Sequence, residues 1–132
     1  MKAYSELREQ PFGGVEVRIE GDTLRVFFDF AEVPMNVQEG QKPSKVVKQL
    51  QYESIDVTGG RNYSDIVSAI VRDRYDDNEA QAILANYTEA VNAASVLKIV
   101  PEKKEEYLQE YAEFQQWRAH VKEIAQKVLT LI

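Results

Sequence analysis

The C-terminal part of the chain, residues 102–132, carries an apolar repeat that determines its secondary structure. Apolar residues follow one another at alternating spacings of 4 and 3 from Tyr107 to Ile132, and Arg118 is the one charged residue in the series. A repeat of about 3.5 residues is typical of an α-helix that packs lengthwise along another helix. We therefore predict one long helix here, with Pro101 at its first position, where a missing N–H costs nothing.

The predicted helix is at least as long as a domain of this size is wide. It spans roughly 46 Å at 1.5 Å per residue, whereas a chain of 132 residues folds to a diameter of roughly 35–40 Å. We expect part of it to pack on its own domain and its end, 128–132, to extend toward a second chain. Arg118 is predicted to fix the register of that pairing. The predicted interface comprises Tyr107, Tyr111, Phe114, Trp117, Arg118, Val121, Ile124, Val128 and Leu131.

The N-terminal third shows the alternation of β-strands. Apolar residues occupy every second position over 15–19 and again over 24–30, which is the pattern of half-buried strands. The pair Gly21-Asp22 between them suits a two-residue type II′ turn, and this turn sets Ile19 opposite Leu24. The two runs are predicted to form an antiparallel hairpin with its apolar side chains on one face.

A third strand is predicted over 46–57, after an exposed connection over 32–44 that contains two prolines. Its apolar positions change phase between Tyr52 and Ile55. One extra residue in a strand inverts the alternation, so a bulge near Glu53-Ser54 explains the change, and two short strands would explain it equally.

Two short helices are predicted between the strands and the long helix. Asn62 and Asp65 have the spacing of a capping box, and Asp76 precedes a second helical stripe with Glu79 three residues on. The apolar segment 96–100 fits either a strand or a helix. The predicted fold is α+β, a single domain over 1–132: a three-stranded antiparallel β-meander (1–60), then two short helices and one long C-terminal helix (61–132).

Composition excludes several classes of protein. The net charge of −6 argues against a chain that coats nucleic acid, because that mode depends on neutralising many phosphates. The chain has no cysteine, so disulfide frameworks and thiolate metal sites are excluded. The charged N-terminus does not resemble a signal peptide, and no apolar run reaches the length of a membrane helix. We therefore expect a cytoplasmic protein without a membrane partner.

No residue pattern predicts catalysis, a metal site, a cofactor or a small-molecule ligand. The single histidine, His120, has no serine or carboxylate at a spacing that suggests a relay. The acidic cluster over 73–79 lacks the ligand alternation of a calcium loop. The pair Gly59-Gly60 lacks the lysine and the further glycines of phosphate-binding loops, so it is interpreted as a turn between strand and helix.

A local basic surface is the basis of one alternative function. Basic residues gather in two stretches, 42–48 and 61–74, with Tyr63 and Tyr75 available to stack on bases. Aspartates are interleaved among them, which favours a solvated face of mixed charge. Nucleic-acid binding is therefore the second hypothesis, and a hydrolase using the carboxylates of 73–79 is the third.

Four helical stretches resemble small uncharacterised accessory proteins encoded by bacteriophages and prophages of gut bacteria. The stretches are 65–75, 79–87, 111–118 and 122–125, which include the sequences DIVSAIVRDRY and YAEFQQWR. The resemblance covers roughly residues 57–128 and brings no catalytic residue with it. It implies a small assembly or accessory protein, and an association with the virion if the chain is phage-derived.

Together these patterns predict a non-catalytic protein that mediates protein–protein interaction or assembly. Its expected partner is a protein, and the long C-terminal helix predicts self-association into a homo-oligomer.

Overall fold

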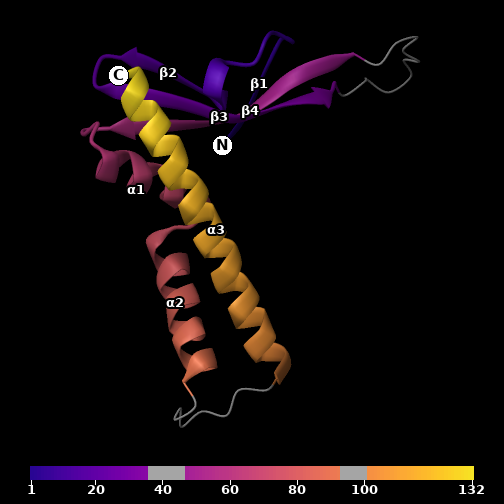
Figure 1. Ribbon diagram of the computed structural model, residues 1–132, viewed down its shortest axis with the longest axis vertical. Helices are drawn as coiled ribbons and strands as arrows, with labels where there is room; N and C mark the ends of the chain where they lie inside the picture. Colours follow the sequence, from indigo (N-terminus) through magenta and orange to yellow (C-terminus); the bar gives the residue numbers. More distant parts are fainter. Residues whose placement is uncertain (36–46, 93–100) are drawn as a thin grey trace. The chain divides into compact units, whose positions relative to one another are not determined.

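The computed structural model describes residues 1–35, 47–92 and 101–132 and shows an α+β fold (Figure 1). Within these residues, four strands come first along the chain and three α-helices follow. This order agrees with the predicted α+β class. The elements are β1 Lys2–Ser5, the 3₁₀-helix η1 Phe12–Gly14, β2 Val15–Glu20, β3 Thr23–Pro34, β4 Lys48–Thr58, α1 Tyr63–Arg74, α2 Asp77–Val91 and α3 Pro101–Leu131.

The chain forms two compact units, each described by itself below. The sheet unit comprises Met1–Ile66 and Ile124–Ile132, and the helical unit comprises Val67–Glu123. The first therefore contains the four strands together with the last turns of α3. The second contains α2, most of α1 and the larger part of α3.

The sheet has four antiparallel strands in the order β1-β4-β3-β2, so the predicted number of three strands is wrong. The additional strand, β1, pairs with β4 and sets Ala3 opposite Tyr52. Its sequence, KAYS, is only four residues long and has no large apolar residue on the half-buried positions. An edge strand this short shows too little alternation to be recognised before its neighbour is placed.

The β2–β3 hairpin has the predicted register. Ile19 lies opposite Leu24, and Val15 lies opposite Phe28. The turn residue Gly21 has a φ of 59°, and Asp29 is the only described non-glycine residue with a positive φ. A positive φ at the first central position alone defines the type II′ turn, so the predicted turn type is confirmed.

The bulge lies in β3, and its predicted position near Glu53-Ser54 in β4 is wrong. Phe28 pairs with Glu53 and Ala31 with Gln51, so Asp29 and Phe30 together face the single residue Tyr52. Asp29 takes the left-handed conformation, with a φ of 54°, which suits the extra residue of a bulge.

The phase change in β4 arises because the strand buries different faces along its length. Leu50 and Tyr52 lie on one face, whereas Ile55 and Val57 lie on the other, since strand residues alternate. Tyr52 packs against Phe27 and Phe30, with ring centroids 5.4 and 5.1 Å apart. Both faces of the sheet therefore hold apolar contacts.

Most of the core of the sheet unit lies on one face of the sheet, whereas Leu50, which is also fully buried, lies on the other. The buried strand residues on the first face include Leu24, Val26 and Phe28, all at most 1% exposed. The last turns of α3 run up to the sheet (Figure 1) and contribute further buried residues. Lys127 Nζ donates a hydrogen bond of 3.1 Å to the carbonyl oxygen of Gly13. The buried helical residues of this unit are Ile66, Ile124, Ala125 and Val128.

Both predicted helix caps are present. The Asp65 amide donates to Asn62 Oδ1 at 2.8 Å, and the Glu79 amide donates to Asp76 Oδ1 at 2.7 Å. Such caps satisfy amides that have no partner inside the helix. Helix α3 spans Pro101–Leu131 and is 31 residues long, and the residues directly before Pro101 lie outside the described part of the chain.

Two further predictions concern other parts of the chain. The segment 96–100, for which the sequence left strand and helix open, lies outside the described residues, as does most of the predicted connection over 32–44. Among the helices of the described residues, none combines the length and the apolar character needed to cross a membrane.

The bulge at Asp29 gives a prediction about stability. Replacing Asp29 by valine should lower the free energy of unfolding by about 1–2 kcal/mol, because a β-branched residue is strained at positive φ. Asp29→Asn is the matched control and should change it by less than about 0.5 kcal/mol, since asparagine tolerates this conformation. Urea denaturation followed by circular dichroism measures both, and equal stability of the two variants would contradict the assignment of the bulge.

Candidate interaction surfaces

Most of the interface predicted on α3 is covered by the chain itself. Of the nine residues, only Leu131 is exposed, with 51% of its surface accessible. Tyr107, Tyr111 and Arg118 are half-buried. Periodicity shows which stripe of a helix is buried, but it does not show whether the same chain or another one covers it. The five buried members of the predicted interface are Phe114, Trp117, Val121, Ile124 and Val128.

Aromatic contacts join the elements of the helical unit. Tyr87 of α2 stacks on Tyr111 of α3, with ring centroids 3.6 Å apart and planes 13° from parallel. Tyr75, between α1 and α2, meets Phe114 edge-on at 5.0 Å. Aromatic pairs contribute beyond the area they bury, so these contacts hold α2 alongside α3 within this unit.

Trp117 lies beside a polar hollow. The guanidinium carbon of Arg74 is 3.7 Å from the centroid of the Trp117 ring, and the His120 ring lies 5.8 Å from the same side chain. The hollow has a volume of about 370 Å³ and is also lined by Glu113 and Gln116. Arg74 is held here by the indole face, a cation–π contact.

Arg118 makes its contacts within its own helix. Its Nη1 donates to Gln115 Oε1 at 3.2 Å, and its guanidinium carbon is 5.9 Å from the ring of Phe114. Its role in fixing a register between two chains stays a prediction.

The acidic residues of the cluster over 73–79 make different contacts from one another. Asp76 caps α2, and Asp77 pairs with Arg72 at 3.4 Å. Glu79 lines a groove together with residues of α2 and α3. Among the described residues, no three histidine, cysteine, aspartate or glutamate side chains are arranged to hold a metal ion.

The groove between α2 and α3, called here the acidic groove, was not found from the sequence. It has a volume of about 330 Å³ and is lined by Tyr75, Glu79, Ala82, Ile83, Asn86, Glu110 and Glu113. Its α2 members recur at the spacing of one helix face, which is a detectable pattern. Which residues of α3 lie opposite depends on how the two helices pack, and the sequence alone does not show that.

The surroundings of the acidic groove are negatively charged. A hydrogen bond of 3.1 Å to Glu106 raises the pKa of Lys103. The charges of Glu106 and Tyr107 raise this pKa further, desolvation lowers it, and the charge of Glu110 also raises it. The acidic residues in the first half of α3 therefore stabilise the charged form of a cationic group near them.

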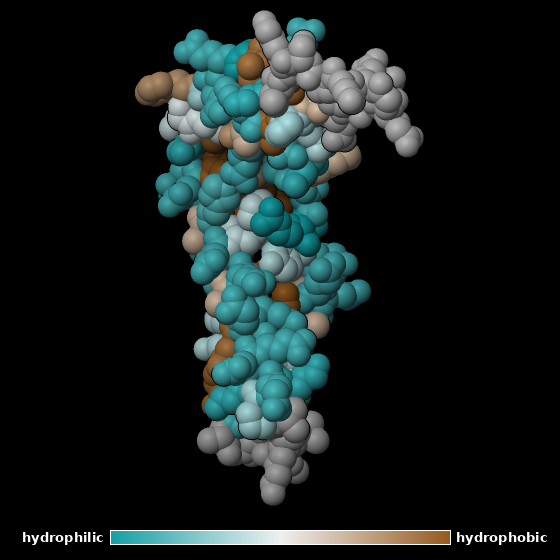
Figure 2. All heavy atoms as spheres, turned by 90° about the vertical axis from the view of Figure 1, so that its right-hand side faces the viewer, coloured by the Kyte–Doolittle hydropathy of each residue, from teal (hydrophilic) through white to brown (hydrophobic). Residues whose placement is uncertain are grey.

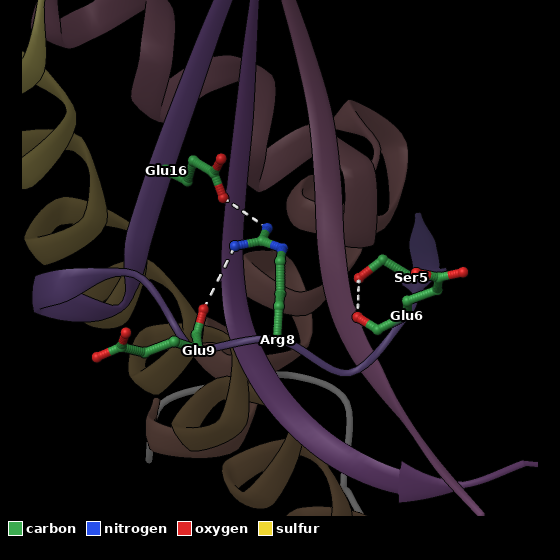
Figure 3. A network of polar contacts seen from close by, with 5 residues as sticks. All are labelled: Ser5, Glu6, Arg8, Glu9 and Glu16. Atoms are coloured by element: carbon green, nitrogen blue, oxygen red, sulfur yellow. Dashed lines mark hydrogen bonds and ion pairs between the residues drawn. The ribbon is translucent and has the colours of Figure 1, made fainter.

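The sheet face opposite most of the core carries an aromatic–arginine cluster, defined by Phe27, Phe30, Tyr52, Arg8 and Arg18. The guanidinium carbons of Arg8 and Arg18 lie 5.7 and 5.8 Å from the rings of Phe30 and Phe27. Arg8 also pairs with Glu16 at 2.7 Å and donates to the carbonyl oxygen of Glu9 (Figure 3). The residue series 15–20 and 23–28 predicted the hairpin, but not this cluster, which depends on Arg8 reaching across from another segment.

An exposed apolar patch lies near the β1 edge of the sheet. Tyr4, Leu7, Met35 and Val47 are each about half exposed and line a hollow of about 430 Å³. Residues 36–46, which adjoin Met35 and Val47 along the chain, lie outside the described residues.

The three arginines of the predicted nucleic-acid surface each make a contact within the chain. Arg61 Nη2 donates to the carbonyl oxygen of Gly21 at 2.6 Å, Arg72 pairs with Asp77, and Arg74 stacks on Trp117. Lysines 42 and 45 lie outside the described residues.

No family model matches the chain, and no curated protein or solved structure matches it either.

The contact between Arg74 and Trp117 gives a second prediction. Arg74→Met should lower the free energy of unfolding by about 0.5–1 kcal/mol and shift the emission of Trp117, the single tryptophan of the chain. Arg72→Met removes an exposed ion pair and is the matched control, with an expected change below about 0.5 kcal/mol and unaltered emission. Fluorescence during urea titration measures both quantities, and an unchanged emission spectrum in Arg74→Met would rule the contact out.

Proposed function

We propose that the protein is a non-catalytic interaction or assembly protein that self-associates through the C-terminal end of α3. The proposal involves no cofactor, metal, membrane or small-molecule substrate. Its main support is the apolar stripe of α3, which continues past the part that the chain covers. Leu131 follows the buried Ile124 by one heptad and is 51% exposed, and Ile132 follows the buried Val128 by one turn and is 44% exposed.

The end of α3 is the part of the helix best suited to a second chain. Its buried neighbours on the same stripe are fully packed, so the exposed residues extend an existing apolar surface. Single exposed apolar residues are common on monomers, whereas adjoining ones that continue a buried stripe are typical of interaction sites. The lower half of Figure 2, which faces the α3 side of the helical unit, is mainly hydrophilic. The end of the helix is therefore a better site for binding a second chain than its outward face.

A role in assembly also agrees with the resemblance of the helical stretches to phage-encoded accessory proteins. For such a protein, a surface that joins copies of the chain is the functional site. A virion-associated location follows only if the chain is phage-derived.

Substitution of Leu131 tests the proposal. Leu131→Glu places a charge in the proposed interface and should weaken self-association by at least about tenfold, because an apolar contact is replaced by a desolvated carboxylate. Gln126→Glu adds the same charge at an exposed position on another side of α3 and should leave the association constant unchanged. Sedimentation equilibrium over a range of protein concentrations measures both. A wild-type protein that stays monomeric throughout, or equal effects of the two variants, would refute self-association through this end.

A second candidate function is binding of single-stranded nucleic acid on the aromatic–arginine cluster. The specific observation in its favour is the combination of three aromatic rings and two guanidinium groups on one face of an antiparallel sheet, a common platform for stacked bases. The pairing of Arg8 with Glu16 opposes it, because a phosphate would have to displace that carboxylate.

The second function predicts salt-sensitive binding that depends on Phe27. A labelled oligonucleotide should bind the wild-type protein, and Phe27→Ala should weaken binding by about 1–3 kcal/mol if bases stack there. Phe12→Ala, which removes an exposed ring of η1 outside the cluster, is the matched control. Fluorescence anisotropy at low and physiological salt measures the affinity, and the absence of binding at low salt would exclude this function.

A further inference from the structure

The acidic groove combines an apolar floor with three carboxylates. Ala82 and Ile83 belong to one face of α2, and Tyr75 lies beside them with its ring against Phe114. Glu79 comes from the first turn of α2, whereas Glu110 and Glu113 come from α3, one turn apart. Apolar surface makes up the larger part of the lining. The groove can therefore bind a side chain that has an apolar stem and a positively charged end.

None of the three carboxylates forms an ion pair with a lysine or arginine in the part of the chain that the structure describes. Lys103 interacts with Glu110 over a greater distance, and Arg74 lines a neighbouring hollow with Glu113. No lysine or arginine nitrogen of residues 1–35, 47–92 or 101–132 lies within 4 Å of Glu79, Glu110 or Glu113. Glu113 accepts one hydrogen bond, from the neutral amide of Gln109. In the sheet unit, by contrast, the charges of Arg8 and Glu16 are paired. The negative charge of the groove is thus available to a ligand.

The two helices that form the groove are negatively charged, as the groove is. Helix α2 and the segment 101–113 of α3 contain eight acidic residues and two lysines. Charges of one sign along a groove concentrate counter-charged partners and speed their association. They also repel phosphates, so this part of the protein is unsuited to nucleic acid.

We propose that the acidic groove binds lysine or arginine side chains of a basic segment in a partner protein. The methylene stem of such a side chain packs on Ile83 and Ala82, and its cationic head donates hydrogen bonds to the three carboxylates. Arginine fits best, because its planar group can bind two carboxylate oxygens at once. This inference rests on the proposed interaction function and adds the chemistry of a partner at a surface separate from Leu131.

A short labelled peptide in which arginines alternate with alanines tests the proposal. Fluorescence anisotropy should show binding to the full chain that weakens between about 50 and 300 mM salt, because exposed charges are screened over this range. The same peptide with citrulline in place of arginine keeps the shape without the charge and should bind at least about tenfold more weakly.

Two triple variants separate the groove from the general acidity of the helices. The groove variant, with Glu79→Gln, Glu110→Gln and Glu113→Gln, should lose at least about tenfold in peptide affinity. The control variant, with Glu89→Gln, Glu105→Gln and Glu123→Gln, has the same net charge and substitutes exposed residues of the same two helices. It should lose less than about threefold. Circular dichroism and Trp117 emission check that both variants are folded.

Three results would overturn the proposal: no binding of the arginine peptide at low salt, equal binding of the citrulline peptide, or equal losses in the two triple variants. Amide chemical shifts of the wild-type protein give an independent readout, and shifts in the peptide titration that avoid α2 and 110–113 would also refute it. Self-association is measured separately through Leu131→Glu. A failure at the groove with intact self-association therefore leaves the proposed function in place.

Discussion

The apolar stripe of α3 is the constraint on which the rest of the structure depends. Phe114, Trp117 and Val121 are buried in the helical unit, and Ile124 and Val128 are buried in the sheet unit. One helix thus supplies core residues to both. Burial of side chains of this size contributes about 1.5–3 kcal/mol each. The surfaces left for function are those that this stripe does not use.

The sequence predicted those parts of the fold that depend on local pattern. Alternation and the Gly21-Asp22 turn were sufficient for the register of the β2–β3 hairpin, and Asn62 and Asp76 marked the starts of two helices. The fourth strand was missed because β1 is short and is recognisable as a strand only through its pairing with β4. The bulge was assigned to the wrong strand because a change in which face is buried, at Tyr52, has the same signature as an inserted residue.

The candidate surfaces were predictable only in part. Spacing identified the stripe of α3 correctly, but whether Phe114 or Leu131 remains available to a partner depends on the packing of the folded chain. The acidic groove needs Glu79 and Glu110, which are distant in sequence, to meet across two helices. Likewise, the aromatic–arginine cluster needs Arg8 to reach Phe30. Composition argued against nucleic acid and the long helix predicted a protein partner, but neither predicted where acidic side chains of the two helices meet.

The division of α3 between the units has a consequence for how the chain folds during synthesis. The strands emerge from the ribosome before α3, so the buried residues Ile124, Ala125 and Val128 of the same unit emerge well after the strands that they cover. Contacts between segments so far apart in sequence form slowly, because a long loop must close before they are gained. The apolar face of the hairpin therefore stays exposed while the helical unit is translated, and this interval is when the nascent chain is most prone to aggregate or to need a chaperone.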